Sequence, residues 1–308
     1  MHRTGGDRAR RAGQCAGTSA CRRRGRFLTQ RLAFTHRRVR RLRGLLQKRS
    51  ARWAERAFVA EGAELVRGAL AAGAPVESVY VSPAGDDDRA TQDVVRRAAT
   101  AGARVFPLGA GVLERVADTV TPQPILAVLP MLEEPPPGAP EWEARPGALV
   151  VVLVDVRDPG NAGTVLRAAD ASGVQAVVFA GDSVDPYNPK TVRSSAGSIF
   201  HVPVAVWASA GEVATALRDA DGFRTLATVV RDGDDYAGLD WSVPSALFLG
   251  NESAGLDPAL VATLDAAIVI PMTGLAESLN VGVASAVVSF EAFRQRRGGG
   301  RGAPNMQG

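Results

Sequence analysis

The sequence predicts an α/β protein with two domains, and three observations support that prediction. Short apolar runs alternate with stretches of helical periodicity along most of the 308 residues, which is the pattern of strands separated by helices. A chain of this length exceeds one ordinary hydrophobic core. A segment rich in proline and charge, residues 133–147, interrupts the alternation and is expected to be a linker.

Residues 1–35 are expected to form a disordered, arginine-rich tail. Few apolar residues accompany the arginines there, so too little surface could be buried to offset the entropy cost of ordering. Because 34 of the 36 basic residues are arginine, a GC-rich genome explains this composition as well as a function does. Residues 1–49 contain 16 basic side chains and one acidic one, whereas the rest contains 20 basic and 31 acidic side chains. The net charge of +4 therefore hides a basic front end and an acidic body.

The first domain is expected over residues 36–132. It opens with a basic helix over about residues 36–49, in which apolar residues recur at spacings of three and four while arginine fills the other face. Strands are then predicted near 58–62 and at 78–81, 104–106 and 125–129, alternating with helices at 63–72, 90–101 and 111–117.

The second domain is expected over residues 148–297, followed by a flexible tail over 298–308. It opens with Leu149–Val154, a continuous β-branched run that is typical of a strand buried on both faces of a parallel sheet. Further strands are predicted at 176–179, 224–229, 246–249 and 267–270, and a last helix from Asn280 to about Arg296.

Several classes of protein are excluded or poorly supported. No run approaches the roughly 18 apolar residues of a membrane span, and no secretory signal is seen, so a membrane protein is excluded and a cytoplasmic location is expected. The two cysteines and three histidines lack metal-ligand spacing, so no metal site is expected. His201 is the only histidine beyond residue 36, so the chemistry is not expected to rest on imidazole.

Three polar loops follow directly after predicted strands, where open α/β sheets build their ligand sites. In the first loop, residues 155–163, Asn161 is a candidate helix cap. Arg167 lies in the mostly apolar helix that follows, where a charge is expected to need a partner or a ligand. The second and third loops cover residues 249–256 and 270–280. Each loop alone is also consistent with an ordinary turn or cap, and the missing glycine fingerprint argues against a nicotinamide-dependent oxidoreductase.

Taken together, the loops resemble the three motifs of the SpoU/TrmH family of RNA ribose 2′-O-methyltransferases. The resemblance covers residues 148–296 strongly and 36–130 more weakly, where the chain is similar to a ribosomal-protein-like substrate-binding domain. A fourth stretch, residues 185–204, also resembles the family, and Gly282 departs from the serine of many members. The matching motifs are Asn161-x-Gly163-x-x-x-Arg167, Gly250-Asn251-Glu252-x-x-Gly255-Leu256, and Ile270-Pro271-Met272 with Glu277-Ser278-Leu279-Asn280-Val281.

The resemblance implies the fold, the cofactor and the site. It implies a parallel sheet threaded into a trefoil knot, as in the SPOUT superfamily, S-adenosylmethionine as methyl donor, and a homodimer. By motif position, the cofactor-binding residues are Gly250, Asn251, Ile270 and Leu279. The catalytic set implied by the motifs is Arg167, Asn161, Glu252, Ser278 and Asn280.

The roles of these residues follow from their positions in the motifs. Arg167 would act either as the general base or as a cation that holds a phosphate and stabilises the developing alkoxide. Asn161 would orient the first loop or contact the ribose. Glu252 would hold the loops together through backbone hydrogen bonds, and Ser278 and Asn280 would shape the pocket.

The resemblance implies an RNA substrate, and the first domain favours ribosomal RNA, specifically 23S RNA. Two alternatives remain at this point: the same reaction on transfer RNA, and a catalytically silent RNA-binding or ribosome-assembly protein. Since an acidic body would repel RNA, the basic helix at 36–49 is the main candidate for RNA contact.

Overall fold

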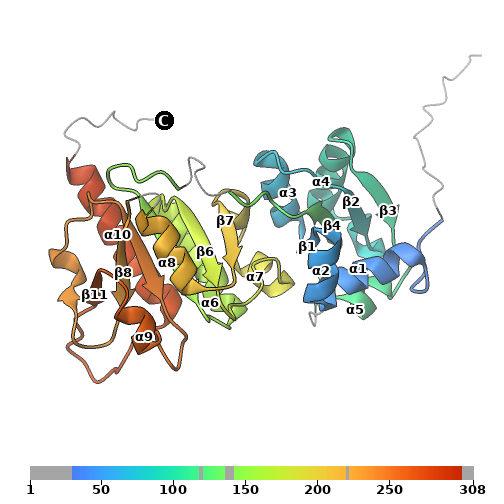
Figure 1. The fold of residues 1–308 in the computed structure, drawn as a ribbon. Coiled ribbons are helices and arrows are strands. Elements are labelled where there is room, and N and C mark those ends of the chain that lie inside the picture. The colour runs from blue at the N-terminus through green and yellow to red at the C-terminus, as the bar shows by residue number, and fades with distance from the viewer. Residues whose placement is uncertain (1–29, 118–120, 136–141, 220–221, 300–308) are drawn as a thin grey trace, which may run out of the picture. The chain divides into compact units, whose positions relative to one another are not determined.

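The computed structural model describes residues 30–117, 121–135, 142–219 and 222–299. Its strands form two sheets, one of four strands and one of seven, each flanked by helices (Figure 1). The predicted α/β class is therefore confirmed. No helix in the described part of the chain is both long and apolar enough to cross a bilayer.

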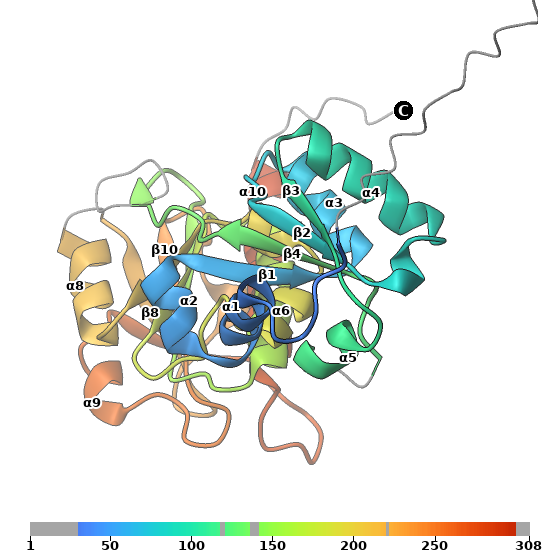
Figure 2. The same cartoon turned by 90° about the vertical axis from the view of Figure 1, so that its right-hand side faces the viewer.

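The first sheet has the strand order β1-β4-β2-β3 (Figure 2). The central strand β4 pairs antiparallel with β1 and with β2, and β2 pairs parallel with β3. Every residue of β1 and β2 is buried, because helices cover both faces of the sheet. The strands are β1 (Ala57–Glu61), β2 (Ser78–Val81), β3 (Arg104–Pro107) and β4 (Ile125–Pro130).

Two pairs of helices cover this sheet. Phe58 and Ala60 of β1 point into the cluster that contains α3 and α4, whereas Ala57 and Val59 point into the cluster that contains α1 and α5. This alternation is the period-two pattern of a strand between two layers. The helices are α1 (Arg37–Gln47), α3 (Ala63–Ala71), α4 (Arg89–Thr100) and α5 (Val112–Val116).

The basic helix predicted over 36–49 ends earlier than expected, and a second helix follows it. Lys48 has an extended backbone, which separates α1 from α2 (Arg49–Glu55). The predicted tail over 1–35 needs a correction as well, since Leu32 donates its amide to the Pro107 carbonyl at 2.8 Å and packs against the α1 cluster. Residues 1–29, the remainder of that prediction, lie outside the described residues.

The second sheet has the order β7-β6-β5-β10-β8-β11-β9, and all of its pairings are parallel. β10 lies between β5 and β8, so strands distant in sequence are neighbours in the sheet. The strands are β5 (Leu149–Val154), β6 (Ala176–Ala180), β7 (Val204–Trp207), β8 (Arg224–Thr228), β9 (Asp234–Asp235), β10 (Ser245–Leu249) and β11 (Ala266–Val269).

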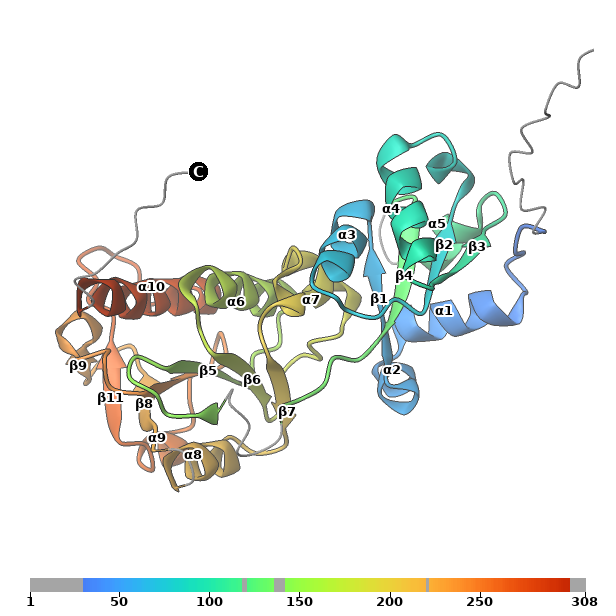
Figure 3. The same cartoon turned by 90° about the horizontal axis from the view of Figure 1, so that it is seen from above.

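Helices cover both faces of this sheet as well (Figure 3). Leu149, Val151 and Leu153 of β5 pack with α6 and α10, whereas Val150 and Val152 pack with α8. Burial on both faces explains why β5 is continuously apolar. The helices are α6 (Pro159–Ser172), α7 (Pro189–Ser194), α8 (Ala210–Asp219), α9 (Pro258–Val261) and α10 (Val281–Gly299).

The end of the predicted linker packs onto the second domain. Trp142 is buried in the cluster that contains α8, and its indole N–H donates to the Pro135 carbonyl at 2.9 Å. Gly147 donates to the Ser242 carbonyl at 2.6 Å. Packing of the second domain therefore begins before residue 148, where the sequence placed its boundary.

A buried ion pair connects α2 with the segment between β6 and α7. Arg52 and Asp185 each have a side chain that is 3% exposed, and a guanidinium nitrogen of Arg52 lies 2.7 Å from a carboxylate oxygen of Asp185. Tyr187 packs beside the pair, between Phe58 of β1 and Trp53 of α2.

Candidate functional site

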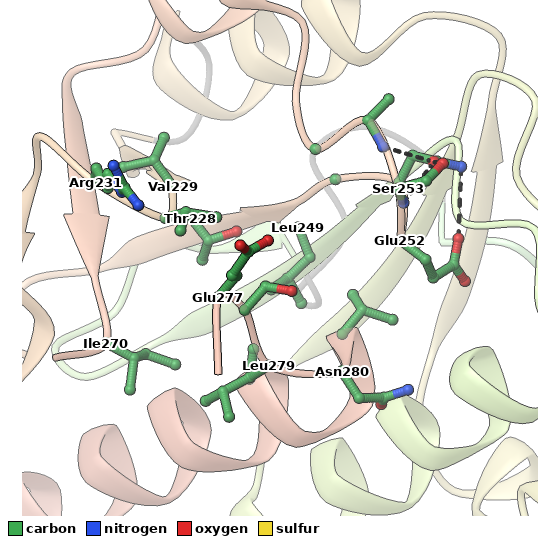
Figure 4. A pocket seen from close by; sticks show the side chains of 18 of the residues that line it. Thr228, Val229, Arg231, Leu249, Glu252, Ser253, Ile270, Glu277, Leu279 and Asn280 are labelled. Carbon is green, nitrogen blue, oxygen red and sulfur yellow. Dashed lines mark hydrogen bonds between the residues drawn. The ribbon is translucent and has the colours of Figure 1, made fainter. Parts of the chain in front are cut away.

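The second and third loops singled out in the sequence border a cavity of about 610 Å³ at one edge of the seven-stranded sheet, together with residues at the end of β8. The first loop is joined to them by hydrogen bonds. Parallel pairing produces this arrangement, because the carboxyl ends of the neighbouring strands β5, β10, β8 and β11 then lie along the same edge. Figure 4 shows Leu249, Ile270 and Leu279 around the cavity, with Arg231 and Glu252 at opposite ends. The predicted residues that line it are Gly250, Asn251, Glu252, Ile270, Ser278, Leu279 and Asn280.

Glu252, Asn161 and Asn280 form a chain of hydrogen bonds that joins the three loops. The Asn161 side-chain amide donates to Glu252 Oε1 at 2.9 Å, and the Asn280 amide donates to Asn161 Oδ1 at 2.8 Å. Asn280 Oδ1 in turn accepts from the Gly282 backbone N–H at 2.9 Å, at the start of α10. Each asparagine thus uses both ends of its amide, a pattern that a carboxylate or an apolar residue could not reproduce.

Glu252 also fixes the backbone of the first loop. Its carboxylate accepts the N–H groups of Asp158 at 3.2 Å and of Arg157 at 3.4 Å. Burial raises the pKa of Glu252, but the hydrogen bonds from Asn161 and from these backbone groups outweigh that effect, and the pKa lies below the usual glutamate value. The carboxylate therefore stays charged and able to accept all of these bonds at neutral pH.

The first loop differs from its prediction in one respect. The cap of α6 is Asp158, whose carboxylate accepts the Asn161 N–H at 2.8 Å, so Asn161 is inside the helix and its side chain is available for the loop network. Just before it, Asp155 adopts a left-handed backbone with φ of 54°, which is strained for a residue other than glycine. Its carbonyl accepts from the Asn251 side chain at 2.8 Å, which ties the first loop to the second.

The second loop is closed so tightly that only glycine fits at its start. A Cβ at Gly250 would lie 2.3 Å from the carbonyl carbon of Gly255. Asn251 and Gly255 exchange backbone hydrogen bonds at 2.9 and 3.1 Å. The Asn251 side-chain oxygen accepts the backbone N–H groups of Ser253 and Ala254, so this oxygen stabilises the second loop.

The cavity fits S-adenosylmethionine by size and by the chemistry of its lining. Its volume lies within the range of small-molecule sites, which is about 300–1,000 Å³. Leu249, Ile270 and Leu279 offer apolar walls for a flat base, the turns around Gly250 bring the backbone close, and the carboxylate of Glu277 suits a cationic ligand.

Part of the lining was not among the candidate site residues taken from the sequence. Thr228 ends β8, and Val229 and Arg231 follow it. Met272 and Glu277 lie in the third motif but were given no role. The strand predicted at 224–229 includes Thr228 and Val229, so its carboxyl end was a signal for a ligand site, but no motif marks the residues after it.

Arg167 is not in the apolar environment that the sequence suggested. It is exposed on α6, while its neighbours Val165, Leu166, Ala168 and Ala169 are buried. The charge therefore faces solvent rather than an apolar core and needs no protein partner. Within the described residues Arg167 makes no ion pair or hydrogen bond, and it does not line the cavity.

The Gly282 departure has a local explanation. A Cβ at this position would lie 2.8 Å from Cγ2 of Thr164, on the facing helix α6. A serine at 282 would therefore require Thr164 to move.

Among the described residues, no three His, Cys, Asp or Glu side chains gather in a way that could hold a metal ion.

Comparison with known protein families gave two matches along this chain. Residues 148–290 match the model of the SpoU rRNA methylase family. Residues 36–127 match the model of the MRM3-like substrate binding domain. The two matches fall on the two sheets described above.

Similar proteins of known sequence or structure include RNA methyltransferases. The chain is 37% identical over 234 residues to the 23S rRNA (guanosine(2553)-2′-O)-methyltransferase RlmP of Bacillus subtilis, covering 76% of this chain and 87% of that protein. It is 32% identical to the 23S rRNA (guanosine-2′-O-)-methyltransferase RlmB of Ralstonia nicotianae, covering 72% and 88%. A crystal structure of an AdoMet-bound rRNA methyltransferase from Sinorhizobium meliloti has a TM-score of 0.74 at 30% identity, covering 85% of this chain and 96% of that one.

Proposed function

This chain belongs to the SpoU rRNA methylase family, and on that premise we propose how its two domains divide the work. It is an RNA ribose 2′-O-methyltransferase of the trefoil-knotted SPOUT class that uses S-adenosylmethionine. In our proposal residues 36–132 hold the RNA and residues 148–297 transfer the methyl group. The observation that carries the proposal is the Glu252–Asn161–Asn280 chain, which joins all three motif loops beside the cavity.

The proposed substrate is 23S ribosomal RNA. Its support is that RlmP and RlmB, which resemble this chain over most of their length, are named for ribose methylation of that RNA. The match of residues 36–127 to a substrate-binding domain agrees with this assignment. A ribosomal substrate also favours the cytoplasm as the place of action.

The cofactor would be held by Gly250, Asn251, Ile270 and Leu279, through the close backbone and apolar walls described above. When bound, it supplies an electrophilic sulfonium methyl group. The ribose 2′-oxygen would accept that methyl group and release its proton, and the sulfur would leave as a neutral thioether. Ser278 and Asn280, at the cavity edge, would orient the ribose for this in-line displacement.

We assign Arg167 the role of a cation rather than that of the base. Its side chain is exposed and no carboxylate in the described residues neutralises it. Guanidinium groups remain protonated in proteins, so a phosphate beside the target ribose is the natural partner. The charge would also stabilise the alkoxide that develops on the 2′-oxygen.

Methyl transfer from labelled S-adenosylmethionine into ribosomal RNA tests this function. We expect Arg167→Ala to lower kcat/KM by at least about a hundredfold, the size of effect seen when one oxyanion-stabilising group is removed. Cofactor affinity should not change, because Arg167 does not line the cavity. Arg96→Ala, an exposed arginine on α4, is the matched control. Absence of transfer by the wild-type protein to any RNA would refute the function.

We also propose that the enzyme is a homodimer that associates through α10. Val283 and Phe290 are two turns apart on this helix and are 46% and 45% exposed, which leaves an apolar face open to solvent. We expect Val283→Glu/Phe290→Glu to convert dimers into monomers in sedimentation velocity, while Val243→Glu, at another exposed apolar position, leaves the mass unchanged. A monomeric wild-type protein would contradict this.

A further inference from the structure

A second cavity, of about 630 Å³, lies at the same edge of the seven-stranded sheet as the first. It is bounded by the residues that follow β5 and β6, by the end of β7 and the residue after it, and by the first residue of α2. Its lining consists of Arg49, Asp155, Gly181, Asp182, Val206, Trp207 and Ala208. None of these residues is among the proposed cofactor-binding residues, which are Gly250, Asn251, Ile270 and Leu279.

Two short connections join this cavity to the first. Asn251, which lines the first cavity, donates its side-chain amide to the carbonyl of Asp155, which lines the second, at 2.8 Å. Arg157 forms the other connection, since its N–H donates to Glu252 and its guanidinium lies 3.9 Å from the Asp182 carboxylate. A polymer whose target ribose lies at the first cavity therefore has its neighbouring nucleotides within reach of the second.

The position of Arg49 is fixed by the buried ion pair one turn further along α2. Arg52 bonds to Asp185 at 2.7 Å and also donates to the Leu45 carbonyl at 2.9 Å, so this helix is held on the segment after β6. Trp53 packs on Tyr187 of the same segment. Arg49 is exposed and, within the described residues, has no carboxylate partner, which leaves its charge available to a ligand.

The second cavity is better suited to a nucleobase than to a bare phosphate. Its formal charges nearly cancel, because Asp155 and Asp182 accompany Arg49 and the adjacent Arg157. Trp207 is partly buried against the cluster that contains α8 and also lines the cavity. Indole surfaces stack on bases of any sequence, and a neighbouring arginine contributes a phosphate contact.

We propose that this second cavity is a subsite for an unpaired nucleobase of the RNA substrate, which stacks on Trp207 while Arg49 contacts the adjoining phosphate. The subsite rests on the proposed function, because it presumes that RNA is the substrate. It places one nucleotide next to the target in contact with both domains.

The test compares two fluorescein-labelled probes of about twelve residues, an oligouridylate and an abasic oligomer with the same number of phosphates. Fluorescence anisotropy at low salt gives their affinities for the full-length protein. We expect Trp207→Ala to weaken oligouridylate binding at least about fivefold and to leave the abasic probe unchanged. Trp207→Phe should retain most of the affinity, and Arg49→Ala should weaken both probes.

Several controls separate stacking from misfolding and from failure of the main function. Val243→Ala is the control for Trp207→Ala, and Arg96→Ala is the control for Arg49→Ala. Unchanged thermal midpoints and cofactor affinity show that the variants are folded. Equal loss for both probes with Trp207→Ala, or no loss for either, would overturn the subsite. Methyl transfer to ribosomal RNA should show a raised KM with little change in kcat for Trp207→Ala. If the wild-type protein methylates RNA and Trp207→Ala leaves KM unchanged, the subsite fails while the proposed function stands.

Discussion

Gly250 begins the second loop, at the point where the loop closes on Gly255. A Cβ there would come within 2.3–2.5 Å of backbone atoms of Gly255 and Leu256, and backbone atoms cannot move aside as a flexible side chain does. Both the Asn251–Gly255 hydrogen bonds and the cavity wall depend on this closure.

We therefore expect Gly250→Ala to weaken S-adenosylmethionine binding at least about tenfold, because the altered loop no longer shapes the cavity. Isothermal titration calorimetry measures the change. Gly274→Ala is the matched control, since a Cβ at Gly274 meets nothing within 4 Å. Equal affinities for the two variants would show that the closed loop is not needed for binding.

Single residues also show how far the sequence could predict the site. Gly250, Ile270 and Leu279 were predicted to border one site, and they surround one cavity because parallel strands bring their carboxyl ends together. Thr228 and Arg231 were missed, since an unremarkable turn after β8 carries no signature of what it faces. Arg167 was singled out for a burial that it does not have, because the side of a helix that faces solvent depends on the whole packing arrangement.

At the scale of elements, α1 combines a core face with a charged one. Leu42 and Leu45 are fully buried, so the helix cannot be removed without opening the first domain. On its outer side Arg37, Arg40 and Arg43 are exposed at spacings of three. Any RNA-binding role of this helix must therefore be tested by changing side chains rather than by truncation.

We expect Arg37→Ala/Arg40→Ala/Arg43→Ala to weaken RNA binding and to reduce the slope of log affinity against log salt by about two to three, since each lost phosphate contact removes about 0.7–0.9. Filter binding over a salt series gives the slope. Arg89→Ala/Arg96→Ala/Arg97→Ala on α4 removes the same charge and should leave the slope nearly unchanged. Equal slopes for the two triple variants would move the RNA contact away from α1.

Elements were predictable where one pattern extended through a whole segment. The run Leu149–Val154 was predicted as a doubly buried strand, and both of its faces are covered. The break at Lys48 was not predictable, because no glycine or proline marks it and arginines continue through it. β7 was not predicted, although strands as short as it were predicted elsewhere in the chain.

At the scale of the whole molecule, the Arg52–Asp185 pair is a buried polar connection between the two domains, and Arg193 pairs with Glu61 across them at 3.3 Å. The Arg52 and Asp185 side chains are both 3% exposed, so the loss of one partner leaves the other charge in a nearly water-free environment. Asp185 also accepts the Tyr187 N–H at 3.0 Å. The ion pair therefore ties α2 to the segment that leads into α7.

We expect Arg52→Met to lower the free energy of unfolding by about 3–5 kcal/mol, because it leaves a buried carboxylate without its cation. Arg52→Met/Asp185→Asn should recover part of that loss. Arg97→Met, which breaks an exposed pair with Asp93, should cost less than about 1 kcal/mol. Urea unfolding followed by circular dichroism measures all three, and an Arg52 effect as small as the Arg97 effect would mean that the pair contributes little.

The position of β10 also constrains the order in which this protein can be assembled. β10 fills the gap between β5 and β8, and β5 precedes it by about ninety residues. Pairings over such long sequence separations form slowly, since loop closure costs entropy before any contact repays it. The loop after β10 contributes to the cavity, so no partly synthesised chain that lacks β10 has a complete binding site. We therefore expect cofactor binding to appear late during refolding, with a rate set by insertion of the central strand.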